Sequence, residues 1–156
     1  MGLPEQVMGR VSLYGVLKSY TRPPHLSIFF AVALTGGEKQ VLSVEWIKCG
    51  DSGEWCSLNT VNLDHQHFVG LDGVYVIFGR NGRVIRVGQG RIKDRLAAHR
   101  IDREIQAYTD GGLLVTWAKV AAGNLDGVER FLAIKLKPLI GARFPDVLPR
   151  EVNLPT

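Results

Sequence analysis

The chain lacks a long apolar run. No stretch of its 156 residues reaches the roughly 20 consecutive apolar residues that a membrane-spanning helix needs. The segment LSIFFAVAL (26–34) follows Arg22 and has the basic flank and short apolar core of a signal peptide over about residues 22–37. Pro23 and Pro24 stand directly before this core, however, and the core begins late in the chain. We therefore expect a buried strand or short helix there, in a cytoplasmic protein that does not contact a membrane.

Cysteine is also scarce. Cys49 and Cys56 are the only two, and two thiolates alone cannot complete the four-ligand shell of a zinc site. His65 and His67 could complete such a set, although the C-x6-C and H-x-H spacings match no common zinc module. A disulfide between the two cysteines would suit an oxidising compartment. For a cytoplasmic protein we expect two buried or free thiols instead.

No internal repeat and no low-complexity tract divides the chain. Its length suits one domain with a small appendage. We expect the domain at residues 67–156, with an extended tail from about Phe144 because that tail holds three prolines. Residues 1–66 are expected to form an N-terminal extension of unknown role, in which Val11–Leu17 and Gln40–Ile47 are candidate strands.

Residues 73–99, GVYVIFGRNGRVIRVGQGRIKDRLAAH, are the most informative part of the chain. The runs GVYVIF and RVIRVG are rich in β-branched and aromatic residues, and Asn81-Gly82 stands between them. Asn-Gly between two such runs is the strongest short signal for a β-hairpin, because both residues tolerate positive φ. The pattern therefore predicts two antiparallel strands joined by a tight turn.

Helices are predicted at about residues 92–108 and 127–137. The first has an approximate apolar stripe, and it places Arg95 and His99 four residues apart on one face. The second ends immediately before a proline. LLVTWAKV (113–120) is a third candidate strand. Together these elements predict an α+β fold with a small, mainly antiparallel three-stranded sheet flanked by helices.

Positive charge is concentrated in one window. Residues 83–103 hold seven Arg or Lys and two Asp, a net charge of +5, whereas the whole chain carries +4. A surface that binds a polyphosphate needs such a concentration, although a solvated helix face is the simpler alternative. The basic residues that we expect to contact nucleic acid there are Arg83, Arg91, Lys93, Arg100 and Arg103.

The same region resembles the GIY-YIG nuclease superfamily. Gly73-Val74-Tyr75 corresponds to the first half of that name, and Arg86-Val87-Gly88 corresponds to the second. Arg95 and His99 match the Arg-x-x-x-His motif of the family's first helix, and Glu129 matches a glutamate on a later helix. The motifs occur in the family's order and spacing, and the resemblance covers somewhat under half of the chain.

The resemblance implies a metal-dependent endonuclease that hydrolyses nucleic-acid phosphodiester bonds, with DNA favoured over RNA as the partner. It implies that Tyr75 acts as the base or orients the attacking water. We expect Arg86 and Arg95 to hold the phosphate and to lower the phenol pKa from its ordinary value of about 10. His99 would relay a proton or orient these groups. Glu129 would hold Mg²⁺ or Mn²⁺ together with phosphate oxygens and waters.

Two departures leave a second class of function open. Arg86 stands where tyrosine is usual, and the position about a dozen residues after Glu129, where the family often has asparagine, falls near Gly141. The nearest later asparagine is Asn153, whose role we leave unassigned. The alternative is a catalytically inactive nucleic-acid-binding or protein-interaction module. Glu129 also has a second interpretation, as the far member of a helix capping box that begins at Asp126.

Overall fold

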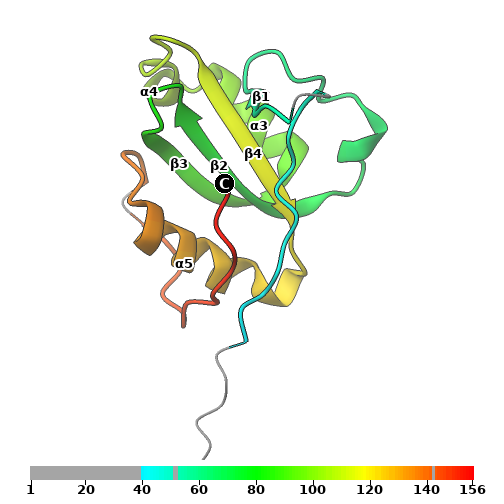
Figure 1. The fold of residues 1–156 in the computed structure, drawn as a ribbon, viewed down its shortest axis with the longest axis vertical. Helices are drawn as coiled ribbons and strands as arrows, with labels where there is room; N and C mark the ends of the chain where they lie inside the picture. Colours follow the sequence, from blue (N-terminus) through cyan, green and yellow to red (C-terminus); the bar gives the residue numbers. More distant parts are fainter. Residues whose placement is uncertain (1–39, 51–52, 142) are drawn as a thin grey trace, which may run out of the picture. The chain divides into compact units, whose positions relative to one another are not determined.

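The computed structural model describes residues 40–50, 53–141 and 143–156. These residues form an α+β domain in which four antiparallel strands, in the order β1–β4–β2–β3, carry helices on both faces (Figure 1). The candidate strand at Val11–Leu17 and the apolar segment at 26–34 lie outside the described residues. No helix within the described ranges is long and apolar enough to cross a membrane.

The predicted hairpin is present. β2 (Asp72–Gly79) pairs in antiparallel fashion with β3 (Val84–Arg91). Gly82 adopts a φ of 78° and donates its N–H to the carbonyl oxygen of Gly79 at 2.9 Å. Asn81 does not share this positive φ, so the turn is longer than the two-residue form in which both central residues are left-handed.

The sheet has one strand more than predicted. β4 (Leu113–Lys119), the expected third strand, pairs with β2 on the side opposite β3. β1 (Cys56–Ser57) then pairs with β4 and makes the sheet four-stranded. The expectation of three strands is therefore wrong, because a two-residue strand is too short to produce a recognisable alternation. The sheet also extends across the boundary that we expected at residue 66.

The helix predicted at residues 92–108 is broken at Asp102. α3 (Ile92–Ile101) ends there, and α4 (Arg103–Gln106) begins anew. Asp102 has an extended backbone with ψ of 113°, and its side chain accepts hydrogen bonds from the backbone N–H groups of Glu104 and Ile105. An aspartate that caps a new helix competes with continuation of the old one, and apolar periodicity does not report that competition.

α5 (Leu125–Leu136) begins earlier than the expected Gly127. Its N-cap is Asn124, so Glu129 lies inside the helix, beyond the positions that a cap satisfies. The capping-box interpretation of Asp126 and Glu129 is therefore wrong. The helix buries one face against the sheet, and Glu129 lines a pocket together with residues of β3.

The sheet separates two apolar cores. Successive residues of β2 point to opposite faces, and both faces are buried, one under α3 and α4 and the other under α5 (Figure 1). A strand buried on both faces has a nearly continuous apolar sequence, which explains why GVYVIF shows no polar alternation. The side chains that define the two cores include Tyr75, Ile77, Ile92, Leu96 and Ile105 on the first face, and Val74, Val76, Val128 and Leu132 on the second.

The segment at residues 144–156 contains no helix and no strand beyond a single β-bridge, in which Val152 pairs with Leu42. Asn153 fastens the two segments together. Its Oδ1 accepts the backbone N–H of Val44 at 2.7 Å, and its Nδ2 donates to the carbonyl of Val44 at 2.9 Å. The expected strand at Gln40–Ile47 is reduced to a single parallel β-bridge with the tail. Asn153 therefore has a packing role.

Cys49 and Cys56 form a disulfide, with their Cα atoms 4.9 Å apart. The backbone N–H of Cys49 donates to the carbonyl of Glu54 at 2.7 Å, and this turn brings the cysteines within the separation that a disulfide requires. The expectation of two thiols is therefore wrong. The zinc alternative is also wrong, because the two sulfurs are bonded to each other even though His65 and His67 line a pocket with Cys49.

Candidate functional site

A mainly polar pocket of about 260 Å³ lies at the edge strand β3. Side chains from β2, β3, α3 and α5 meet in it. The pocket contains four of the five predicted site residues, and the fifth, His99, lies behind Tyr75. The lining residues are Tyr75, Arg86, Gly88, Gln89, Gly90, Arg95 and Glu129.

Tyr75 owes its position to Gly88. The two residues are paired across β2 and β3, and the phenol lies directly against the glycine. A Cβ atom at Gly88 would stand 2.1 Å from the Tyr75 hydroxyl oxygen, well inside any real contact distance. Glycine is therefore required at this position so that the tyrosine can cross the neighbouring strand and reach the pocket.

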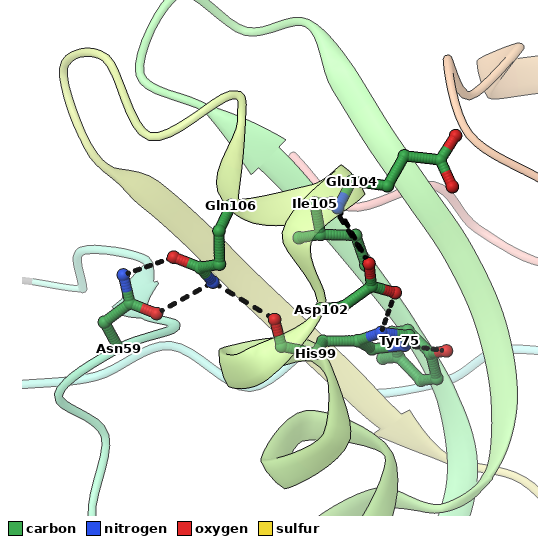
Figure 2. Close-up of polar contacts among 7 residues, drawn as sticks. All are labelled: Asn59, Tyr75, His99, Asp102, Glu104, Ile105 and Gln106. Atoms are coloured by element: carbon green, nitrogen blue, oxygen red, sulfur yellow. Dashed lines mark hydrogen bonds and ion pairs between the residues drawn. The ribbon is translucent and has the colours of Figure 1, made fainter.

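The hydroxyl of Tyr75 is hydrogen-bonded to Nε2 of His99 at 2.6 Å (Figure 2). Both side chains are buried, with exposed fractions of 2% for Tyr75 and 9% for His99. Burial, followed by the positive charge of Arg86, lowers the pKa of His99 to about 4. The imidazole is thus neutral at pH 7, and one of its two ring nitrogens is a hydrogen-bond acceptor.

The phenol of Tyr75 is harder to ionise than the sequence suggested. Burial raises its pKa above the ordinary value, and this effect outweighs the lowering by the charge and hydrogen bonding of Arg86 and by the charge of Arg95. Our expectation that the two guanidiniums would lower the phenol pKa was therefore wrong in its net direction. Local sequence shows which cations are near but does not show how deeply the phenol is buried.

Arg86 occupies space that a larger residue at 141 would need. A Cβ atom at Gly141 would lie 2.8 Å from Nη1 of Arg86. Gly141 also adopts a φ of 108°, which disfavours asparagine and other residues with side chains. The Nε atom of Arg86 is buried and has no hydrogen-bond partner among the described residues. The arginine and the glycine therefore fit each other at the two positions where this chain departs from the expected motif.

Arg95 reaches the pocket from the first turn of α3. Its Nε donates to the backbone carbonyl of Gln89 at 3.0 Å, and its side chain passes close to Gly90, where a Cβ atom would lie 3.0 Å from Nε. This bond uses one of the five guanidinium N–H donors. Arg95 is otherwise exposed and presents a positively charged fork at the mouth of the pocket.

Glu129 is the buried carboxylate of the pocket, with an exposed fraction of 9%. Burial raises its pKa, although hydrogen bonding by Gln89 and the charge of Arg86 oppose that rise. Gln89 also donates its side-chain N–H to Oδ1 of Asp126. Sequence reasoning missed Gln89, because an uncharged amide carries no charge signal. Its position between Gly88 and Gly90 was the only available indication.

Three of the basic residues predicted to contact nucleic acid are exposed: Arg83, Arg91 and Arg103. Lys93 instead forms an ion pair with Asp64, with 2.8 Å between Nζ and Oδ1. Arg100 is half-buried and donates through Nε to the carbonyl of Leu58 at 2.7 Å and through Nη2 to the carbonyl of Val61. Arg100 therefore ties the segment after β1 to α3, a structural role that the charge pattern did not indicate.

Glu129 is the residue best placed to hold a divalent cation. Within the described ranges, no three His, Cys, Asp or Glu side chains come together as a complete metal site. A single carboxylate completed by phosphate oxygens and waters is a normal shell for Mg²⁺. A cation held by Glu129 would therefore need further oxygen ligands from outside the protein, such as those of waters or a phosphate.

No protein-family model, curated protein or solved structure matches this chain. The assignment of its function therefore depends on the pocket and on the resemblance carried by the motif residues themselves.

Proposed function

We propose that this protein is a metal-dependent endonuclease of the GIY-YIG type, which hydrolyses nucleic-acid phosphodiester bonds and prefers DNA. The observation that carries the proposal is the pocket at β3, which gathers a phenol, two guanidiniums and a carboxylate from four separate elements. Phosphodiester hydrolysis needs a proton acceptor and fixed positive charge around the developing anion, and this set of groups supplies both.

In this mechanism Tyr75 acts as a protonated phenol, because burial raises its pKa. Its oxygen orients the attacking water and takes a proton from it while its own proton passes to Nε2 of His99, 2.6 Å away. The water oxygen forms the new bond to phosphorus as the bond to the leaving oxygen breaks. Arg86 and Arg95 hold the non-bridging phosphate oxygens, where a planar guanidinium can donate to two oxygens at once.

Glu129 would hold Mg²⁺ or Mn²⁺ in this pocket, and such an ion stabilises the charge on the leaving oxygen when it is bound. The carboxylate must be ionised to act as a ligand. Burial raises its pKa, so metal affinity should decline at a higher pH than for an ordinary glutamate as the solution is acidified.

The alternative function is a nucleic-acid-binding or protein-interaction module that keeps the fold without turnover. Two observations favour it: Arg86 replaces the usual tyrosine, and Gly141 has no side chain to contribute. The close packing of Arg86 against Gly141 is equally compatible with an active pocket, in which the Arg86 guanidinium binds phosphate alongside that of Arg95.

A plasmid-nicking assay with Mg²⁺, repeated with EDTA, separates the two functions. We expect nicking that EDTA abolishes, and a loss of about 10²-fold or more in Tyr75→Phe, the lower range for removal of a proton-transfer group. Tyr108→Phe is the matched control, because Tyr108 is exposed and does not line the pocket. DNA binding without nicking under either Mg²⁺ or Mn²⁺ would contradict the proposal and favour the binding module.

A further inference from the structure

The second ring nitrogen of His99 has no hydrogen-bond partner in the part of the chain that the structure describes. Nε2 is bonded to Tyr75, whereas Nδ1 is buried and makes no hydrogen bond to any described residue. A buried polar atom left without a hydrogen bond destabilises the folded state, so the groups that face this nitrogen matter. The carboxylate of Asp102 faces this nitrogen, with Oδ2 3.9 Å from Nδ1 (Figure 2).

Asp102 is held in this orientation by α4. Its Oδ1 accepts the backbone N–H of Glu104 at 2.9 Å and that of Ile105 at 3.5 Å. One carboxylate oxygen is therefore committed to the helix cap, and the other is directed toward His99. Figure 2 shows the three side chains in sequence, with Asp102 on one side of the imidazole and Tyr75 on the other.

The corner between α3 and α4 is braced by a second set of contacts. The Nε2 atom of Gln106 donates to the backbone carbonyl of His99 at 3.1 Å and to Oδ1 of Asn59 at 3.2 Å. Asn59 returns a hydrogen bond from Nδ2 to Oε1 of Gln106 at 3.3 Å. The break between α3 and α4 is thus held by two sets of contacts, the helix cap made by Asp102 and the hydrogen bonds of Gln106 (Figure 2).

Four ionisable side chains act on His99 from the elements around it. Tyr75 approaches from β2, Arg86 from β3, Arg95 from the same helix, and Asp102 from the junction of α3 and α4. Burial and the two arginines keep the resting ring neutral with one N–H, and the doubly protonated ring arises only when Tyr75 passes its proton in the proposed reaction. A carboxylate facing Nδ1 favours that N–H at Nδ1, because a nitrogen lone pair there would oppose the negative oxygen.

We infer that Asp102 is a positioning residue that fixes the Nδ1–H tautomer of His99 and so makes the Tyr75 hydroxyl the donor to Nε2. In the opposite tautomer, Nε2–H would donate to the phenol oxygen, and the phenol could no longer pass its proton to His99. The effect of Asp102 on cleavage rests on the proposed function. Its effect on the tautomer does not.

The test uses the full chain at pH 7 and long-range ¹H–¹⁵N NMR correlations of the histidine rings, which report which ring nitrogen carries the proton. His99 is assigned by the signals that disappear in His99→Gln. We expect the Nδ1–H tautomer in the wild-type protein. In Asp102→Asn the amide oxygen keeps the cap, because asparagine is as good an N-cap as aspartate, and the NH₂ group then faces Nδ1. We therefore expect His99 to change to the Nε2–H tautomer.

Asp94→Asn is the control, since it removes an exposed carboxylate from the first turn of the same helix. It should leave the tautomer of His99 unchanged. Asp102→Ser provides a second variant if the asparagine protein does not fold, because serine also caps helices and removes the charge that faces Nδ1. An Nε2–H tautomer in the wild type, or an unchanged Nδ1–H tautomer in both Asp102 variants, would overturn the inference.

Nicking measured on the same samples separates this inference from the proposed function. In serine proteases, the asparagine substitution that produces the wrong histidine tautomer lowers kcat roughly 10⁴-fold. A loss of 10²-fold or more is expected for Asp102→Asn here. A tautomer change in a protein that never nicks DNA would support the role of Asp102 and contradict the nuclease. Nicking by the wild-type protein, with no tautomer change in the Asp102 variants, would support the nuclease and contradict the role of Asp102.

Discussion

Tyr75 and His99 form a buried pair at the candidate site, joined by a 2.6 Å hydrogen bond. The sequence places the two side chains on a strand and a following helix, but it does not show their burial or their contact. Burial dominates their protonation, raising the pKa of Tyr75 and lowering that of His99. The chemical roles could therefore be proposed from the motif, whereas the protonation states required the packing.

The lowered pKa of His99 predicts a loss of stability in mild acid. An unfolded histidine has a pKa of about 6.5, whereas that of folded His99 is about 4. The unfolded state therefore binds the proton first as the pH falls, and stability is lost between about pH 6.5 and pH 4. The loss should approach about 3 kcal/mol at most, by the linkage between pKa and unfolding free energy.

Urea unfolding of the wild type and of His99→Gln at several values between pH 7 and pH 4 measures this effect. Glu129 acts in the opposite direction, because a folded carboxyl with a raised pKa takes up its proton before the unfolded one and gains stability on acidification. The comparison with His99→Gln removes this contribution, since both proteins keep Glu129. If the free energies of unfolding of the two proteins fall in parallel as the pH is lowered, His99 is not the group that causes the loss of stability.

At the scale of elements, long periodic segments were predicted and short or capped ones were not. The β2–β3 hairpin, β4 and α5 follow from β-branched runs, a turn signal and a helical stop. β1 was missed because it is only two residues long. The break at Asp102 was missed because a local cap overrides the apolar stripe that continues through it.

The disulfide that closes the turn before β1 should contribute measurably to stability. It spans a sequence separation of 7 residues, for which the loop-entropy relation gives about 2–3 kcal/mol. We expect dithiothreitol to lower the Tm of the wild type. The Cys49→Ser/Cys56→Ser double variant should have the lower Tm from the start and should not respond to the reductant.

An unchanged Tm on full reduction, verified by thiol titration, would contradict that expectation. The bond also bears on location, because disulfides persist in oxidising compartments and are rare in the cytosol. It therefore favours such a compartment over the cytoplasm that we expected from the sequence.

At the scale of the whole molecule, the site depends on β3 being an edge strand. α3 and α5 pack on opposite faces of the sheet, so Arg95 and Glu129 can meet only around an edge strand. Leu139 and Ile140 pair with the outer side of β3 at its Val84–Arg86 end, away from Gly88 and Gly90. The motif order in the sequence placed these residues on the correct elements. Their convergence follows from the order of the strands, which the sequence did not specify.

Binding to DNA should depend strongly on salt. Each phosphate neutralised on duplex DNA contributes a slope of about −0.9 to log K against log salt concentration. Arg86 and Arg95 line the pocket and Arg91 is exposed at the end of β3, so about three contacts predict a slope of roughly −3. Arg91→Ala should lower the affinity for all sequences and make the slope shallower by about 1.

Fluorescence anisotropy on the Glu129→Gln background, across a salt series and with two unrelated duplexes, measures this slope. Arg100→Ala is the contrasting variant, because Arg100 bonds to backbone carbonyls of Leu58 and Val61. Its main effect should be a lower Tm. A flat salt response would mean that the basic window is only a solvated surface.

The most direct test of the nuclease assignment is plasmid nicking by Glu129→Gln, with the Tm measured on the same sample. Removal of the carboxylate should abolish metal-dependent nicking. The Tm at pH 7 should be unchanged or higher, because burial disfavours the ionised form of this side chain. Glu104→Gln, which alters an exposed carboxylate outside the pocket, should nick DNA at the wild-type rate. Nicking by Glu129→Gln at the wild-type rate would contradict the role of Glu129 and the metal-dependent mechanism built on it.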